Sequence, residues 1–345
     1  MSGTRRQWRA VLALGVLLAF CPCASALDPS LDINQYAHTS WKVRDGFAKG
    51  RFTQIAQTSD GYLWPGTEFG LLRFDGVRAI PWDPPSGQRI PDTYIRALLG
   101  TRDGALWIGT LKGLAKWKDG KLTQYSELDG HYVDALLEDR EGTIWAGAGG
   151  FDPNQGGRLC AIRGSSIECH GQDGSLGRYV GSLLEDSEGN VWAAGTTGIR
   201  RWEPGPPQVY SDISSSGLES LAETTDHALL AIGYNKIENF YKLIRIIGGK
   251  SHAYSIPGEN HARAFRPDRI FRDRDGGLWI GTLDRGLFHV HRGRTDVFSK
   301  SDGLSSDEIE YIFEDREGNV WVNTSGGLDR FREYAITTLE TSRDY

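Results

Sequence analysis

The chain has 345 residues and a formal net charge of −6, from 39 basic and 45 acidic residues. An acidic chain is a poor partner for nucleic acid, because phosphate recognition depends on clustered Lys and Arg. Beyond residue 26 no segment approaches eighteen consecutive apolar residues, so we expect no transmembrane helix in the mature chain.

Residues 1–26 have the organisation of a secretory signal peptide. Arg5, Arg6 and Arg9 form a basic start, residues 10–20 are apolar, and Ala24-Ser25-Ala26 offers a small-residue cleavage site. We therefore predict an exported bacterial protein, periplasmic or extracellular, by either the Sec or the twin-arginine route. Cleavage removes three arginines and no acidic residue, which takes the net charge from −6 to −9.

A short phrase recurs along the chain, in which an acidic residue and a glycine are followed by an aliphatic residue and a tryptophan. Six copies have their anchor at Trp64, Trp107, Trp145, Trp192, Trp279 and Trp321, and a seventh, between the fourth and fifth of these, has Leu230 in the tryptophan's place. Their separations are 43, 38, 47, 38, 49 and 42 residues. This is the unit size of a four-stranded propeller blade rather than of a two-helix repeat.

The second unit shows how one blade is expected to fold. Glycine-containing turns separate its four apolar or alternating segments, which we predict to be strands at residues 94–99, 106–110, 114–117 and 121–125. The last turn, Asp119-Gly120, suits a tight hairpin because both residues tolerate positive φ. The turn carboxylates are expected to accept backbone N–H bonds at Asp103, Asp139, Asp186 and Asp315.

The Trp-x-Gly sequence within these units predicts how blades pack. Side chains alternate along a strand, so the tryptophan and the glycine point to the same face. We expect the indole to lie across the next blade, with the glycine leaving room for that contact. The repeated tryptophans are therefore predicted to be core residues.

The sequence predicts an all-β fold, a seven-bladed β-propeller of four-stranded antiparallel blades over residues 27–332. Residues 36–43 resemble the last strand of other units. We expect this N-terminal segment to pair onto the seventh unit as an outer strand that closes the ring and protects its edge. The C-terminal tail, residues 333–345, is the alternative occupant of that edge.

Residues 66–76, 106–114 and 278–287 resemble the two-component regulator propeller repeat, and the likeness extends over residues 36–332. This repeat builds periplasmic sensor regions of bacterial histidine kinases, including hybrid kinases that respond to oligosaccharides. Typical members add a second propeller, an immunoglobulin-like domain, a membrane helix and a kinase. This chain stops after seven units, so we expect no signalling module of its own. It is then either a free-standing binding propeller or a fragment of a longer sensor kinase.

Motifs for catalysis are not found in the sequence, so we expect neither an enzyme nor a cofactor. There is no His-x-x-x-His helix, nucleophile elbow or phosphate loop. His289 and His291 share a strand face and supply half a metal site. Without a third ligand at defined spacing, we predict no metal and an exposed hairpin face.

Cys160 and Cys169 flank a predicted hairpin with Gly164-Ser165 as its two-residue turn. Counting outward from that turn places the cysteines opposite each other as a non-hydrogen-bonded pair, whose close approach suits a disulfide. Export makes oxidation plausible. We therefore predict a disulfide, with two buried thiols as the alternative.

The central mouth of the ring is the default binding site. Loops between second and third strands, and loops between blades, share one rim and bring forward Glu68, Phe69, Tyr94, Lys112, His131, Tyr132, Arg178, Tyr179, Arg266, Asp284 and Arg285. Aromatic rings beside Arg and carboxylates suit a polyhydroxylated ligand such as an oligosaccharide. A membrane sensor protein is the other expected partner.

The alternative function is a propeller lyase of the streptogramin-lyase type, which has similar blade repeats. It requires a histidine and acidic residues that converge on a metal at the mouth. Among the histidines, His131 is the one that the sequence places there.

Overall fold

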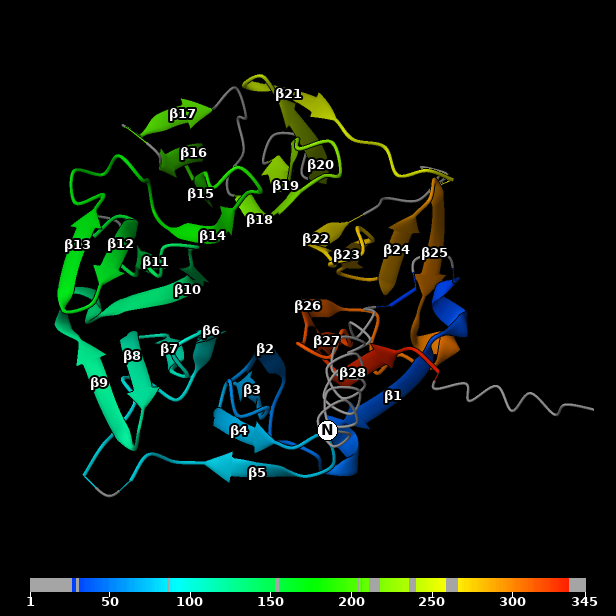
Figure 1. Ribbon diagram of the computed structural model, residues 1–345, viewed down its shortest axis with the longest axis horizontal. Coiled ribbons are helices and arrows are strands. Elements are labelled where there is room, and N and C mark those ends of the chain that lie inside the picture. The colour runs from blue at the N-terminus through cyan, green and yellow to red at the C-terminus, as the bar shows by residue number, and fades with distance from the viewer. Residues whose placement is uncertain are drawn as a thin grey trace, which may run out of the picture.

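A computed structural model describes residues 27–28, 31–85, 87–152, 155–203, 205, 207–210, 218–235, 240–258 and 266–334. Seven four-stranded antiparallel sheets stand around one ring axis, which confirms the predicted all-β propeller (Figure 1). The helical elements in these ranges are short 3₁₀ turns, η1 (Ile33–Gln35), η2 (Val43–Asp45), η3 (Ser126–Leu128) and η4 (Lys300–Asp302). The predicted signal peptide and most of the predicted tail lie outside the described residues.

Each blade begins with its inner strand, which faces the ring centre, and ends with its outer strand (Figure 1). Blade 1 comprises β2 (Phe52–Gln57), β3 (Leu63–Thr67), β4 (Gly70–Phe74) and β5 (Ala79–Trp82). Blade 2 comprises β6 (Ile95–Gly100), β7 (Leu106–Thr110), β8 (Gly113–Lys118) and β9 (Lys121–Tyr125). Blade 3 comprises β10 (His131–Glu138), β11 (Ile144–Gly150), β12 (Arg158–Arg163) and β13 (Ser166–His170).

The remaining blades follow the same order around the ring. Blade 4 comprises β14 (Val180–Glu185), β15 (Val191–Gly195), β16 (Gly198–Glu203) and β17 (Gln208–Tyr210). Blade 5 comprises β18 (Leu218–Glu223), β19 (Leu229–Asn235), β20 (Phe240–Ile247) and β21 (Lys250–Ala253). Blade 6 comprises β22 (Pro267–Arg272), β23 (Leu278–Thr282), β24 (Leu287–His291) and β25 (Arg294–Phe298). Blade 7 comprises β26 (Ile309–Glu314), β27 (Val320–Thr324), β28 (Gly327–Arg332) and β1 (Ala37–Lys42).

Packing between blades follows the predicted Trp-x-Gly pairing. Trp107 is buried, and it belongs to one apolar cluster with Val133 and Ala146 of blade 3. A Cβ atom on Gly109 would come within 2.8 Å of the Val133 carbonyl oxygen. Close contacts with the next inner strand would likewise arise at Gly66, Gly147 and Gly281. The glycine therefore sets how closely neighbouring blades approach, and the tryptophan fills the space beside it.

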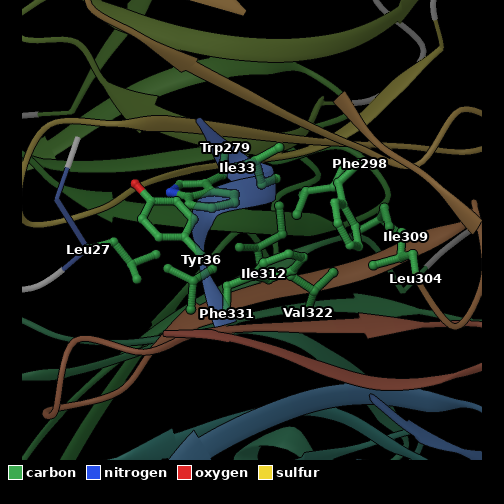
Figure 2. Packing of buried hydrophobic residues seen from close by; sticks show 12 residues of the cluster. Leu27, Ile33, Tyr36, Trp279, Phe298, Leu304, Ile309, Ile312, Val322 and Phe331 are labelled. Carbon is green, nitrogen blue, oxygen red and sulfur yellow. The ribbon is translucent and has the colours of Figure 1, made fainter. Parts of the chain in front are cut away.

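The ring is closed by β1, which pairs with β28 from Ala37↔Arg332 to Lys42↔Gly327. This confirms the predicted N-terminal closure of the seventh blade. The residues before β1 add to it, because Leu27, Ile33 and Tyr36 pack in one core with Trp279 and Phe331 (Figure 2). Within the described ranges, none of the helices has the length and apolar character needed to span a membrane.

Arginine contacts join the turns between first and second strands of several neighbouring blades. Arg140 reaches from blade 3 to the carbonyl oxygens of Asp186 (2.9 Å) and Ser187 (3.4 Å) in blade 4. Arg316 makes the same contact across the closure, from blade 7 to Thr58 and Ser59 of blade 1, both at 3.0 Å. These bonds join adjacent blades on the face opposite the predicted rim.

Candidate functional site at the ring mouth

Every inner strand has a bulge at the same place, one residue after its start or close to it. At this bulge the register between the inner strand and the second strand shifts, so one residue of the inner strand has no cross-strand partner. The unpaired residues are Thr53, Arg96, Asp134, Gly181, Glu219, Asp268 and Glu310. The same register shift therefore recurs in all seven blades and leaves one inner-strand residue of each outside the ladder.

The inner strands of all seven blades line a central cavity of about 220 Å³. Its charged lining residues are Arg96, Asp134, Arg269 and Glu310. The Nε atom of Arg96 lies 2.5 Å from Asp134 Oδ1, and the Arg269 Nη1 atom lies 2.9 Å from Asp268 Oδ2. Burial opposes the charge of Arg96, but Asp134 outweighs it and the pKa of the guanidinium is raised. These charges therefore meet as local pairs of opposite sign.

A second hollow of about 320 Å³ adjoins this cavity and shares Arg96 and Asp134 with it. We call it the mouth groove, and its lining residues are Arg96, Leu111, Tyr132, Asp134, Phe151 and Tyr179. The Arg96 guanidinium lies 5.5 Å from the centroid of the Tyr132 ring, within cation–π range. Phe151 packs edge-on against Tyr132 at 5.1 Å between centroids and is itself 55% exposed.

Strand pairing holds these aromatic residues in place. Tyr132 pairs with Gly149 across β10 and β11, and Gly149 forms an isolated bridge with Tyr179 of the next blade. A Cβ atom on Gly149 would come within 2.4 Å of the Tyr132 hydroxyl, so only glycine lets the ring lie flat there. The mouth groove therefore has a backbone support that spans blades 3 and 4.

The structure brings three of the residues predicted for the rim to this place. Tyr94 lines the central cavity, and Tyr132 and Tyr179 line the mouth groove. Sequence reasoning missed Arg96 and Asp134, whereas the insertion at residues 149–157, which contains Phe151, is expected at the rim from the sequence. A signal existed for the two missed residues, because Arg96 and Asp134 are charged residues within the apolar starts of two inner strands.

The other predicted rim residues do not line either hollow, and several have local partners. Lys112 forms an ion pair with Asp92 at 3.0 Å, and Arg266 with Asp284 at 3.5 Å. The remaining contacts are those of Glu68 with the Arg51 amide, Arg178 N–H with Thr196, and Arg285 over the Phe288 ring. Phe69 is 65% exposed and lines a separate cavity beside Phe47 and Trp82.

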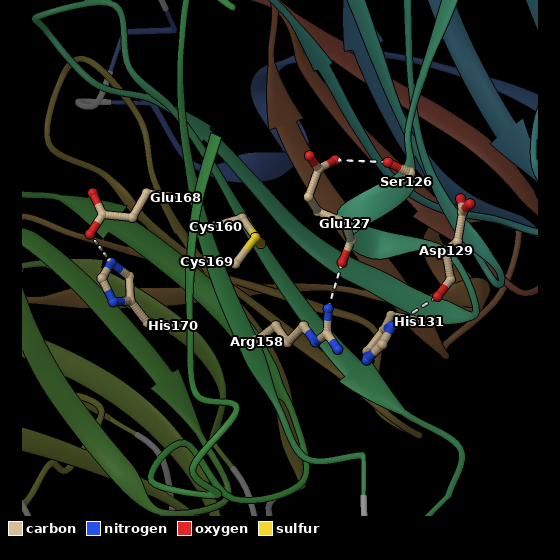
Figure 3. Close-up of a disulfide and its surroundings, with 9 residues drawn as sticks. All are labelled: Ser126, Glu127, Asp129, His131, Arg158, Cys160, Glu168, Cys169 and His170. Atoms are coloured by element: carbon tan, nitrogen blue, oxygen red, sulfur yellow. Dashed lines mark hydrogen bonds and ion pairs between the residues drawn. A yellow bond between two sulfur atoms is a disulfide. The ribbon is translucent and has the colours of Figure 1, made fainter. Parts of the chain in front are cut away.

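The structure differs from the sequence-based expectation at His131. Its side chain is buried, with Nδ1 3.1 Å from the Asp129 carbonyl oxygen, and burial lowers its pKa (Figure 3). His131 begins β10 and pairs there with Gly150 of β11. A buried imidazole at this place does not supply the histidine at the mouth that the lyase alternative requires.

The expectation of an exposed face at His289 and His291 was wrong. Both side chains are buried, at 0% and 4% exposure. The reason is the N-terminal segment, because Tyr36 covers this face of β24 at 6.1 Å between its ring and that of His289. The sequence of the hairpin alone does not indicate that the N-terminal segment covers this face.

Cys160 and Cys169 lie opposite each other on β12 and β13, in the register expected from the Gly164-Ser165 turn. Their sulfur atoms are joined at 1.99 Å (Figure 3). Cys160 is fully buried in the cluster that also contains Trp107. The pair lies in the outer half of blade 3, away from the mouth groove.

A serine, a histidine and a glutamate meet on the opposite face, at the contact of blades 4 and 5. Ser187 Oγ lies 2.8 Å from His227 Nδ1, and Glu223 Oε1 lies 3.0 Å from the same nitrogen. A catalytic triad uses the two ring nitrogens separately, one for the nucleophile and one for the acid. These residues therefore join blades and do not form a relay.

Three segments, residues 89–112, 265–284 and 303–326, match the family model of the two component regulator propeller. No curated protein sequence matches the chain. Among solved structures, the extracellular domain of a putative hybrid two component system from B. thetaiotaomicron is similar with a TM-score of 0.67 and 18% identity. That match covers 88% of this chain and 40% of the other, so this chain spans about two fifths of its length.

The virginiamycin B lyase from Staphylococcus aureus is also similar, with a TM-score of 0.64 and 16% identity over 87% of this chain and 100% of the lyase. A third similar structure is YCF48 bound to D1 peptide, with a TM-score of 0.62 and 13% identity over 91% of this chain and 99% of the other. At these identities the likeness is one of fold. The chain is a seven-bladed propeller, and segments on three of its blades match the two component regulator propeller model.

Proposed function

We propose that this propeller is an exported binding module of the sensor type, which takes an oligosaccharide in the mouth groove and does not cleave it. The observation that supports this most directly is the grouping of Tyr132, Phe151 and Tyr179 around the Arg96–Asp134 pair. Aromatic rings stack on the apolar faces of sugars, and a fixed guanidinium and carboxylate hydrogen-bond to hydroxyl groups.

The similar structures support an extracellular setting for this function, since several are extracellular domains of two component systems. In such a setting the bound state would be passed to a membrane sensor protein, which stays a prediction for this chain. The groove itself spans blades 2 to 4, so a ligand there would contact several blades at once.

The proposal is tested by titration calorimetry with a panel of plant and microbial oligosaccharides. Wild-type protein should give saturable heat with at least one of them, and the sugars should be recovered intact. The double variant Tyr132→Ala/Phe151→Ala should raise Kd by about tenfold or more, because each aromatic contact contributes about 0.5–1.5 kcal/mol. Phe69→Ala is the matched control, since it removes an exposed ring from a different cavity.

Three results would count against the proposal. Absence of heat with every sugar would show that oligosaccharides are not the ligand. Unchanged binding in the double variant would show that the sugar does not bind in the mouth groove. Cleaved product would favour the lyase alternative, which is suggested by the full-length fold match to the virginiamycin B lyase. Far-UV circular dichroism of each variant shows whether the propeller is still folded.

A further inference from the structure

The outer hairpin of blade 6 places two histidines and an aspartate on one face. His289 and His291 lie two residues apart on β24, and Asp296 of β25 is the direct partner of His289. Strand alternation and cross-strand pairing therefore direct all three side chains the same way. One ligand atom from each lies within 4.8 Å of the others.

This cluster is covered by apolar and aromatic residues. His289 stacks on Trp279 at 4.1 Å between ring centroids, and His291 stacks on His289 at 4.5 Å. The amide of Ile33, in the N-terminal segment, donates to Asp296 Oδ2 at 3.0 Å. The same Oδ2 lies 2.8 Å from His291 Nε2. The three residues thus lie between the hairpin and the segment that precedes the closing strand.

His289 is unusual because it is fully buried and neither of its ring nitrogens has a hydrogen-bond partner among the described residues. A buried polar group without a partner costs about 1–3 kcal/mol. A divalent metal ion is a partner that a buried imidazole nitrogen can ligate.

A carboxylate lies beside one of these nitrogens. A Cβ atom built on Gly277 would be 2.6 Å from His289 Nε2 and 2.5 Å from Asp273 Oδ2, so both atoms border the same small space. Blades 4 and 7 have an asparagine in place of Gly277, and its amide bonds to the corresponding aspartate. Ligating histidines commonly direct their other ring nitrogen to a carboxylate, a role that Asp273 is placed to fill.

We propose that His289, His291 and Asp296 form a binding site for Zn²⁺ or a similar divalent transition metal. Two imidazoles and one carboxylate are typical zinc ligands, at about 2.0–2.2 Å from the ion, and leave one position open. The metal gives the unpartnered nitrogen of His289 a ligand bond. It also fixes Asp296, and through it the Ile33 amide, so zinc should strengthen the contact between blade 6 and the N-terminal segment.

The test begins with protein stripped by a chelator and then dialysed against ZnCl₂. Elemental analysis should find one zinc per chain, and the unfolding temperature should rise with zinc concentration, because a ligand that binds the native state stabilises it. Co²⁺ in place of zinc should give the visible absorption of a low-coordinate site with nitrogen ligands. Wild-type protein that retains no zinc and shows no thermal shift would overturn the proposal.

Variants locate the metal. Asp296→Asn keeps an oxygen that can accept from Ile33 but removes the anionic ligand, so it should stay folded and lose at least tenfold in zinc affinity. His289→Phe keeps an aromatic ring against Trp279 and should abolish the thermal shift. His252→Ala is the matched control, because His252 is exposed on β21 of blade 5. Zinc binding that survives the first two variants, or is lost in the control, would place the metal on another surface.

Discussion

In five of the seven blades, a single residue stabilises the blade by accepting a hydrogen bond from the indole N–H of the anchor tryptophan six positions later. The acceptor is a buried aspartate at 2.7–2.8 Å in the pairs Trp145–Asp139, Trp192–Asp186, Trp279–Asp273 and Trp321–Asp315. In blade 1 the hydroxyl of Thr58 accepts the bond from Trp64 at 2.8 Å. The same carboxylates accept turn N–H bonds, as predicted, so one side chain fixes both the turn and the indole.

Asp186→Ala should lower the free energy of unfolding by about 3 kcal/mol, because it leaves a buried indole N–H and two turn amides without an acceptor. Urea denaturation followed by tryptophan fluorescence measures the change. Asp103→Ala is the control, since Asp103 is exposed and pairs with Lys118 at 2.8 Å; its loss should be below about 1 kcal/mol. Equal losses in the two variants would contradict this account.

Only some residues of the mouth groove could be predicted from the sequence. Tyr132 and Tyr179 were predicted from their place next to an inner strand. The contacts of Arg96 depend on the bulge that re-aims it and on its distance to the neighbouring blade. That distance follows from the geometry of the whole ring, which no local pattern specifies. His131 differs from the expectation because its side chain is buried and lies against the Asp129 carbonyl oxygen.

The strand elements differ in how far they depend on distant partners. Twenty-seven strands pair with neighbours in their own repeat, whereas β1 pairs with β28 across almost the whole chain. Its side chains reinforce that pairing, since Trp41 stacks on Trp321 at 5.5 Å and Arg330 lies 5.4 Å from both rings. One short strand therefore completes the last blade.

Deletion of residues 27–44 should expose the edge of β28 and cause aggregation or loss of cooperative unfolding. Light scattering and thermal unfolding report the two outcomes. A chain that lacks only residues 1–26 is the control, because it retains β1, and it should stay monomeric with a sharp transition. If the longer deletion behaves like the control, the edge must be protected in another way.

Across the whole molecule, the seven blades are not equally supported. Blade 5 has Leu230 as its anchor and Thr224 at the aspartate position, where its hydroxyl bonds to the backbone of Ala228 at 2.9 Å. It therefore lacks the indole–carboxylate bond. The repeat period nevertheless predicted this blade, because β18 to β21 keep the spacing and the apolar inner strands that build a core with blade 6.

Amide hydrogen exchange should accordingly be faster in β18–β20 than in β10–β12, where Trp145 bonds to Asp139, because local opening is easiest where fewest buried contacts hold an element. Mass spectrometry of peptides from the two blades in one sample gives the comparison, with blade 3 as the internal control. Equal protection would show that the ring opens as one unit and that the missing bond has no local effect.

The antiparallel pairing of β1 with β28 also determines how the ring responds to tension. The chain enters β1 at Ala37 and leaves β28 at Arg332, and these two residues are direct partners. A force that pulls the two flanking segments apart is therefore applied at one end of the ladder. It breaks the hydrogen bonds one after another, from Ala37 toward Lys42, instead of loading all of them together. A propeller built from seven packed blades thus has a mechanically weak joint where its chain begins and ends the ring.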